Sequence, residues 1–145
     1  VDIIVRICAD RPFVDPILID KAITFYLNNK FDLVFNHISD GNNFWPRGFG
    51  VEVFSLKLLE KISETNTMLF HEEHVTSYVW ENRRNFKIKS VPFDIKDHKI
   101  SDLKLDIDTE EDYEKLRVIS KYISIDSSVE EILSVWRELR KNGKV

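Results

Sequence analysis

The sequence predicts an α/β protein with a mixed, mostly parallel sheet. Apolar runs rich in β-branched residues alternate along the chain with segments in which apolar residues recur at helical spacing. The first strand, helix and strand in this series have the order of a βαβ unit. The length of 145 residues and the 43% hydrophobic and 32% charged residues are typical of one globular domain. We therefore expect a single domain over residues 1–145.

The first strand–helix–strand unit begins at residue 3. Residues 3–8 form an apolar run interrupted only by Arg6, which is typical of a strand buried on both faces. Asp15 can cap a helix that has Pro16 at its first position. The apolar residues of this helix follow at helical spacing: Leu18, Ile19, Ala22, Ile23 and Tyr26. Residues 32–36 are then expected to form a second short strand.

The middle of the chain combines a long loop with further short elements. Residues 37–50 are polar and irregular, and loops of this length inside a compact domain are usually functional. A strand is expected over 51–54, followed by a helix that Ser55 caps. A helix over about 71–82 and a half-exposed strand over 86–91 continue the α/β pattern.

The last third of the chain predicts one strand and two capped helices. Residues 103–108 alternate between apolar and polar side chains, as a strand does. Thr109 opens a helix whose first turn is acidic, which favours the helix dipole. A capping box at 127–131 precedes the last helix, whose buried face would consist of Val129, Ile132, Leu133, Trp136 and Leu139.

Composition excludes several classes of protein. With 21 Lys and Arg against 25 Asp and Glu, the net charge of −4 argues against a nucleic-acid-binding domain. No apolar run approaches the roughly 18–20 residues of a membrane span. Cys8 is the single cysteine, which excludes an intrachain disulfide and fits a cytoplasmic protein. The chain opens directly on a β-branched run, so we expect residues to precede Val1 in a longer protein.

Two aspartates follow predicted strands. Asp10 comes directly after the first strand, and Asp108 comes after the last one. Ligands of open α/β sheets bind beyond the carboxyl ends of the strands, and two carboxylates in one crevice would repel each other. Mg²⁺ would remove that repulsion and is typically held by one or two carboxylates together with substrate phosphates. The pair suggests metal-assisted phosphoryl or nucleotidyl transfer; alternatively, each aspartate is an ordinary cap or turn residue.

Four segments in order carry a family resemblance: VRICADRPFVDP at 5–16, PRGFGVEVF at 46–54, EHVTSY at 73–78 and DIDTEEDY at 106–113. They resemble motifs of the spore coat polysaccharide biosynthesis protein F family, which is similar to CMP-KDO synthetases and acylneuraminate cytidylyltransferases. The resemblance implies a three-layer, Rossmann-like nucleotide-diphospho-sugar transferase fold. It also implies Mg²⁺-dependent transfer of a cytidylyl group from CTP to a sugar, with release of pyrophosphate, although the sequence leaves open which nucleotide and which sugar.

The resemblance also assigns residues. By position, Asp10 and Asp108 match the catalytic metal ligands, and Arg6, Glu52 and His74 match motif positions that we expect to bind the substrate. The family's Gly-rich, basic nucleotide-binding loop has no counterpart here. We therefore expect residues 1–145 to be the C-terminal, sugar- and metal-binding portion of such an enzyme, without its N-terminal nucleotide-binding part.

The long loop and the strand after it predict a homodimer. Residues 37–54 carry Phe44, Trp45 and Phe49 with few charges between them, and aromatic clusters are enriched at interface cores. Related cytidylyltransferases pair through the equivalent stretch, and Arg47 is the residue expected to reach the neighbour's sugar site, where a guanidinium can hold a carboxylate. Alternatively, the loop folds back on its own core with Trp45 as a plug.

Other interpretations remain open. Asp106 and Asp108 also fit the D-x-D motif of fold-A glycosyltransferases, and a chain without the nucleotide loop could be a non-catalytic sugar-binding or dimerisation module. His71 and His74 are three residues apart rather than the four of a helical zinc motif. Arg6 is the only charged residue of a buried strand, so we expect it to pair with a carboxylate.

Overall fold

The computed structural model describes residues 2–37, 45–65, 71, 74–92 and 103–145. Its centre is a four-stranded sheet with the strand order β1-β3-β2-β4. The strands are β1 (Ile3–Ile7), β2 (Leu33–Phe35), β3 (Val51–Ser55) and β4 (Ile88–Ser90). Both β1 and β2 pair antiparallel with β3, and β2 pairs parallel with β4. Three strands therefore run in one direction and β3 runs in the other. The predicted mixed sheet is confirmed, with two antiparallel ladders and one parallel ladder.

The position of β3 was not predicted. Helix α1 (Pro16–Leu27) connects β1 to β2 as expected, but β3 lies between these two strands. Val53 of β3 is in register with Val5 on one side and with Val34 on the other. The βαβ unit is therefore split by a strand that comes later in the chain.

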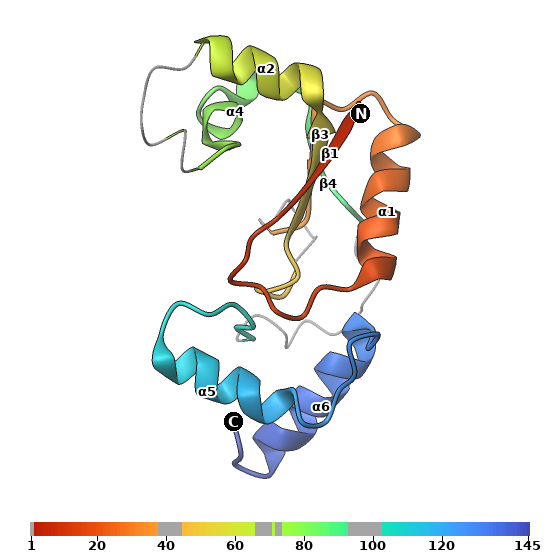
Figure 1. The fold of residues 1–145 in the computed structure, drawn as a ribbon. Coiled ribbons are helices and arrows are strands. Elements are labelled where there is room, and N and C mark those ends of the chain that lie inside the picture. Colours follow the sequence, from red (N-terminus) through yellow and green to blue (C-terminus); the bar gives the residue numbers. More distant parts are fainter. Residues whose placement is uncertain (1, 38–44, 66–70, 72–73, 93–102) are drawn as a thin grey trace.

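Helices cover both faces of the sheet, which gives the three layers that the resemblance implies (Figure 1). Since successive residues of a strand point to opposite faces, neighbouring residues of one strand belong to different cores. On one face, Val34, Val51 and Val53 pack with Leu18 and Ala22 of α1. On the other face, Leu33 and Phe54 pack with residues of α2 (Leu56–Thr65) and α4 (Ser77–Glu81), namely Leu58, Ile62 and Val79.

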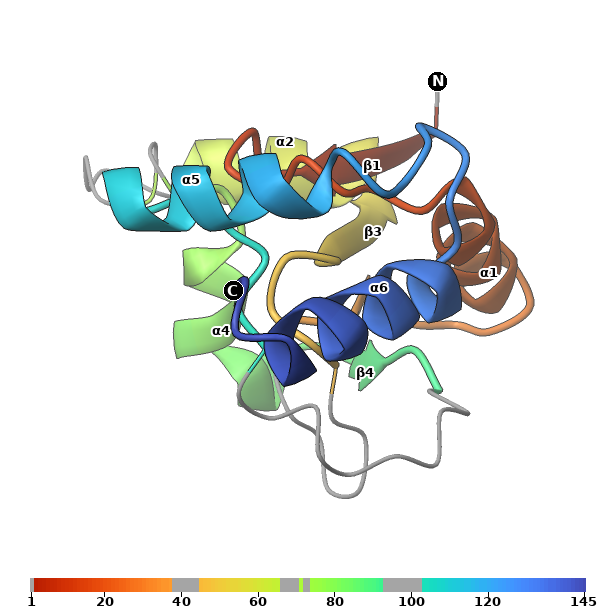
Figure 2. The same ribbon diagram turned by 90° about the horizontal axis from the view of Figure 1, so that it is seen from below.

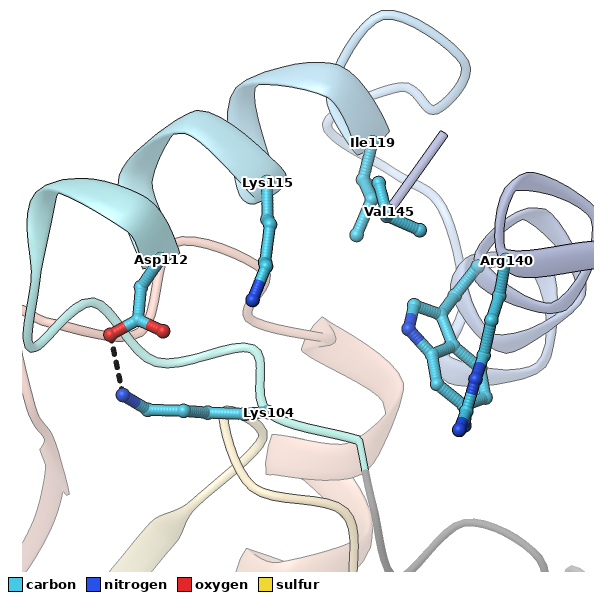
Figure 3. Close-up of a pocket in the computed structure, with 7 residues that line it drawn as sticks. Lys104, Asp112, Lys115, Ile119, Arg140 and Val145 are labelled. Carbon is cyan, nitrogen blue, oxygen red and sulfur yellow. Dashed lines mark hydrogen bonds and ion pairs between the residues drawn. The ribbon is translucent and has the colours of Figure 1, made fainter. Parts of the chain in front are cut away.

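Two further helices, α5 (Glu110–Ile119) and α6 (Val129–Lys141), lie across the end of the sheet where β1 finishes (Figures 1 and 2). Both begin with a capping box: the one before α6 was predicted, whereas at α5 only the start at Thr109 and the acidic first turn were predicted. A small pocket of about 220 Å³ separates them, with Lys115 of α5 and Arg140 of α6 on its walls (Figure 3). No helix in the described part of the chain is long and apolar enough to cross a membrane.

Asp15 connects the start of α6 to the start of α1. One carboxylate oxygen of Asp15 accepts the N–H groups of Ile17 and Leu18, as predicted for the cap of α1. The other oxygen accepts the N–H of Val129 at 3.0 Å, at the start of α6. Asp15 is 5% exposed, so this double cap fixes α6 against α1 from inside the protein.

Two predicted elements differ in the structure. Residues 103–108 do not form a strand: Lys104 makes an isolated bridge with Arg47, and the N–H of Ile107 donates to the carbonyl of Asp10 at 2.9 Å. The alternation arises because Leu103 and Leu105 enter the core while the polar residues between and after them form ion pairs. The helix expected over 71–82 is represented by α4, which begins only after a turn closed by a hydrogen bond from Ser77 to His74; residues 72–73 lie outside the described residues.

Candidate active site

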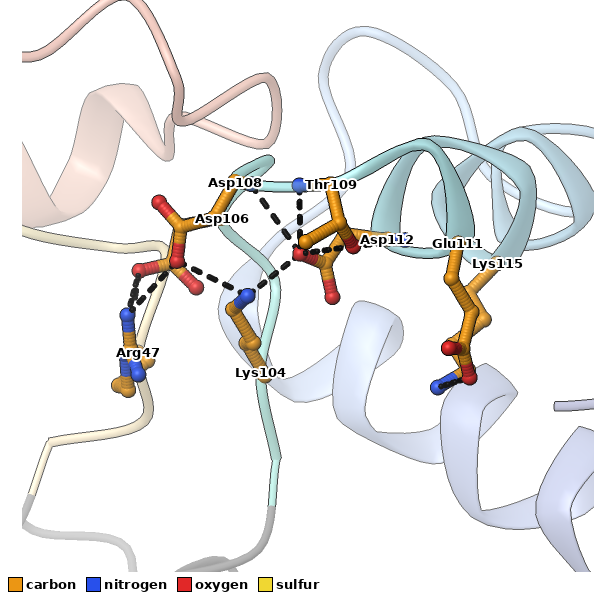
Figure 4. Close-up of polar contacts among 8 residues, drawn as sticks. All are labelled: Arg47, Lys104, Asp106, Asp108, Thr109, Glu111, Asp112 and Lys115. Carbon is orange, nitrogen blue, oxygen red and sulfur yellow. Dashed lines mark hydrogen bonds and ion pairs between the residues drawn. The ribbon is translucent and has the colours of Figure 1, made fainter.

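Three carboxylates gather at the carboxyl end of β1. Asp10 lies just beyond the strand, and Asp106 and Asp108 come from the segment before α5 (Figure 4). One oxygen of each lies within 4.8 Å of the others. The predicted proximity of Asp10 and Asp108 is thus confirmed. Sequence reasoning missed Asp106 as a member of the same cluster and weighed it only as part of a glycosyltransferase motif.

Two cations border this carboxylate cluster. Arg47 donates from Nε and Nη2 to Oδ2 of Asp106 at 3.1 and 2.6 Å, and its Nη2 lies 3.3 Å from Oδ2 of Asp108. Lys104 Nζ lies 2.9 Å from the same oxygen of Asp108. The hydrogen bond from Lys104 is the main reason why the pKa of Asp108 is lowered. Asp108 is therefore a carboxylate rather than a carboxylic acid near neutral pH.

The cluster fits a hard divalent cation. Asp106 is 6% exposed, and its Oδ1 is buried without a hydrogen-bond partner in the described part of the chain. A buried carboxylate oxygen without a partner is destabilising, and a cation at the cluster would satisfy it. Carboxylate oxygens are the ligands that Mg²⁺ prefers, so the residues present fit the metal that the family resemblance implies.

A larger pocket adjoins the cluster. It has a volume of about 570 Å³ and contains three of the four predicted substrate-binding residues, Arg6, Glu52 and His74, together with Cys8, Arg11, His37, Thr76, Ser77, Trp80 and Glu81. The loop after β1 connects the two features, because Cys8 and Arg11 line the pocket while Asp10 belongs to the cluster. The structure therefore brings the predicted residues of β1, β3 and the segment before α4 to one place.

Glu52 forms the floor of this pocket. Although Glu52 is only 1% exposed, its side chain has several polar neighbours. Arg6 donates to it at 2.7 Å, which confirms the predicted pairing of Arg6 with a carboxylate, and the Thr76 hydroxyl donates at 2.8 Å. His37 Nε2 lies 3.6 Å away on the remaining side. These contacts hold the Glu52 side chain in a single orientation.

Gly50 makes room for Arg11. A Cβ at Gly50 would lie 2.0 Å from Nη1 of Arg11 and 2.9 Å from the Cβ of His37. The absence of a side chain at residue 50 therefore allows the Arg11 guanidinium to lie at the pocket wall. Nε of Arg11 is buried without a hydrogen-bond partner among the described residues, so it is a donor that a ligand could use.

Sequence reasoning missed His37, although its place two residues beyond β2, at the carboxyl end of a strand, was a usable signal. The ring packs edge-on against Phe35 and Trp80. Burial lowers the pKa of His37, and the positive charges of Arg11 and Arg6 lower it further, against the opposing effect of Glu52. The imidazole is therefore neutral at pH 7.

This lowered pKa predicts a pH-dependent stability. The unfolded chain takes up a proton at His37 near the ordinary histidine pKa of about 6.5, whereas the folded protein resists it. The free energy of unfolding should therefore fall as the pH falls from about 7 to 5. Urea titrations at both pH values would measure this, and His37→Gln should show a smaller fall. An equal fall in both proteins would exclude His37 as its source.

The aromatic residues Trp45 and Phe49 of the long loop lie against the core of their own chain. The Trp45 indole N–H donates to the carbonyl of Val91 at 3.1 Å, and its ring packs against the main core. Phe49 is 3% exposed. The described residues of this loop thus fold back on their own core, as the alternative interpretation held; Phe44 lies outside the described residues. Homodimerisation through 37–54 stays a prediction.

Arg47 lies at the carboxylate cluster and does not line the large pocket. Its guanidinium contacts both Asp106 and Asp108, so the structure gives it an intramolecular role that the resemblance did not suggest. Whether it also reaches a neighbouring subunit's sugar stays a prediction.

A sheet flanked by helices, with carboxylates and a polar pocket at the carboxyl ends of its strands, is the arrangement of an α/β protein that handles nucleotides or their sugars. The profile of the family described as cytidylyltransferase matches residues 1–140. The chain belongs to the cytidylyltransferase family.

Individual relatives agree with this family. A solved cytidylyltransferase from Leptospira borgpetersenii superposes with a TM-score of 0.81 and 32% identity, covering 99% of this chain and 58% of that one. The uncharacterized protein MJ1063 of Methanocaldococcus jannaschii is 38% identical over 87 residues, which are 60% of this chain and 33% of the relative. The spore coat polysaccharide biosynthesis protein SpsF of Bacillus subtilis is 29% identical over 118 residues, 81% of this chain and 46% of the relative. The chain thus spans less than half the length of these two curated relatives.

Proposed function

We propose that the protein is a Mg²⁺-dependent cytidylyltransferase that activates a sugar for the synthesis of a surface polysaccharide. The observation that carries the proposal is the continuity of cluster and pocket: one short loop places Asp10 among the carboxylates and Arg11 in the pocket. A phosphate held at the carboxylate cluster would lie next to a sugar held in the pocket. The polysaccharide context is supported by the name of the Bacillus subtilis relative, a spore coat polysaccharide biosynthesis protein.

The pocket is the proposed sugar site. Its volume is within the usual range of small-ligand pockets, about 300–1,000 Å³, and most of the residues that line it carry a polar or charged group. Glu52 can accept hydrogen bonds from sugar hydroxyls only through lone pairs that Arg6 and Thr76 leave free. Arg11 and His74 supply further polar groups at the wall. The sugar would thus be oriented by groups that are themselves held in place.

The carboxylate cluster is the proposed phosphate end of the site. Asp10 and Asp108 would hold Mg²⁺, with Asp106 beside them. When bound, Mg²⁺ would supply positive charge for the phosphate oxygens of CTP. The reaction forms a bond between a sugar hydroxyl oxygen and the α-phosphorus and breaks the bond from that phosphorus to the bridging oxygen of the β-phosphate. It yields CMP-sugar, pyrophosphate and the proton of the hydroxyl.

A second function has one observation in its favour. Asp106 and Asp108 lie in the same cluster, as a D-x-D glycosyltransferase motif would require. Asp10 belongs to that cluster too, and the match to the cytidylyltransferase family covers nearly the whole chain. These two findings favour nucleotidyl transfer over glycosyl transfer.

The direct test incubates the intact protein with CTP, MgCl₂ and a panel of free sugars and sugar acids. Pyrophosphate release and the mass of a CMP-sugar are measured together. We expect both to appear in equal amounts with at least one sugar and to disappear when EDTA is added. Sugar binding without consumption of CTP would instead support the non-catalytic module, and consumption of a nucleotide sugar would support the glycosyltransferase.

A further inference from the structure

The two basic side chains beside the cluster, Arg47 and Lys104, contact only one oxygen of each neighbouring aspartate. Both donors of Arg47 that reach Asp106 end on Oδ2, and Oδ1 of Asp106 has no partner in the described part of the chain. At Asp108, Arg47 and Lys104 both contact Oδ2 as well. Among the described residues, the Oδ1 atoms of both aspartates are therefore left for another ligand.

Lys104 is held firmly in this position. Its Nζ also donates to Oδ2 of Asp112 at 2.5 Å. That same oxygen accepts the N–H groups of Asp108 and Thr109 and the Thr109 hydroxyl (Figure 4). The bond from the Thr109 N–H is one half of the capping box of α5. The ammonium group of Lys104 is therefore anchored by the first turn of a helix, and Asp108 is oriented by a fixed charge rather than by a mobile surface lysine.

The number of oxygens that a carboxylate offers distinguishes two common cations. Ca²⁺ takes six to eight oxygen ligands and often binds both oxygens of one carboxylate, whereas Mg²⁺ requires an octahedron and binds carboxylates through single oxygens together with water. A site in which one oxygen of an aspartate is already engaged by a cation disfavours bidentate binding.

We propose that Lys104, together with Arg47, makes the cluster selective for Mg²⁺ over Ca²⁺ by occupying Oδ2 of Asp108 and Asp106. The proposal rests on the proposed function, which assigns a divalent cation to this cluster. Lys104 and Arg47 are positioning residues here, because they act on the metal through the aspartates.

The test measures selectivity rather than activity. Isothermal titration of the intact protein with MgCl₂ and with CaCl₂ gives the ratio of the two dissociation constants, Kd(Ca) over Kd(Mg). Lys104→Gln should lower this ratio about tenfold, within the range that partners of metal ligands commonly contribute. Removing a positive charge strengthens the binding of both divalent ions alike, so the ratio reports the number of available oxygens and not the charge.

Two variants serve as controls. Lys104→Arg keeps a cation at the same place and should retain most of the selectivity. Lys115→Gln removes a nearby lysine of α5 that pairs with Glu111 at 2.8 Å, and it should leave the ratio unchanged. Circular dichroism and a thermal melt show whether the first turn of α5 persists in Lys104→Gln.

The possible outcomes separate this inference from the proposed function. If the wild-type protein binds neither cation, both the metal site and its selectivity are wrong. If it binds Mg²⁺ but Lys104→Gln folds and keeps the wild-type ratio, only the selectivity mechanism is wrong. If Lys104→Gln does not fold, Arg47→Gln provides the same measurement from a different segment, and an unchanged ratio there overturns the proposal.

Discussion

Replacing Asp108 by Asn should reduce the rate of CMP-sugar formation by about three orders of magnitude, because a metal ligand contributes several kcal/mol of charge stabilisation in phosphoryl transfer. Asp108 supplies one of the three clustered carboxylates. Its side chain is half exposed and pairs with Arg47 and Lys104. We therefore expect the fold to persist, so that the loss of rate reports chemistry. Coupled detection of pyrophosphate on the intact protein measures this rate.

The control for Asp108→Asn is Asp126→Asn, which changes an exposed aspartate in the turn between α5 and α6. It should leave the rate unchanged. Titration with Mg²⁺ adds a readout that does not depend on the substrate: Asp108→Asn should bind Mg²⁺ at least about tenfold more weakly. Full activity and full Mg²⁺ affinity in Asp108→Asn would exclude this residue as a metal ligand.

The second large effect concerns stability. Arg6→Met should lower the free energy of unfolding by about 3 kcal/mol, because it leaves the buried Glu52 carboxylate without its charged partner. The two side chains are 27% and 2% exposed and lie 2.7 Å apart. Urea unfolding followed by tryptophan fluorescence measures the loss.

The chain offers a matched comparison for this ion pair. Arg117 and Glu114 also lie 2.7 Å apart, but both are about half exposed. Arg117→Met should therefore change the free energy of unfolding much less than Arg6→Met does, because solvent screens the exposed pair. The double variant Arg6→Met/Glu52→Gln should lose less free energy of unfolding than the two single variants lose together, because no unpaired charge remains. Additive effects would show that Arg6 and Glu52 do not interact in solution.

The local elements could be predicted because their signals are local. Asp15 with Pro16, Thr109 with its acidic first turn, and the capping box before the last helix place helix starts where the structure has them. Arg6 was expected to pair with a carboxylate because it interrupts an apolar run, and the structure supplies Glu52 directly opposite in the sheet. The expected burial of this strand on both faces is wrong, because β1 is an edge strand and only partly buried. Asp10 and Asp108 were expected to lie together because each follows a predicted strand; the structure brings them together although residues 103–108 are not a strand.

What the sequence could not predict depends on contacts between distant segments. Alternation in residues 103–108 has the period of a strand, but the backbone there bonds to Arg47 and Asp10 in two different segments. Asp106 enters the cluster only because those two contacts bend the chain toward β1. His37 and Arg11 meet because Gly50, on a third segment, leaves space for the guanidinium.

The place of β3 between β1 and β2 also decides the order in which this protein can be assembled. Neighbouring strands are about 4.8 Å apart, so β1 and β2 stand about 10 Å apart, too far for their backbones to bond to each other. In a nascent chain that ends before residue 51, β1 and β2 therefore have no ladder between them. Both ladders close when β3 emerges, and Glu52 arrives on that same strand to meet Arg6. The strand that joins β1 to β2 therefore also brings the residue that forms the pocket floor.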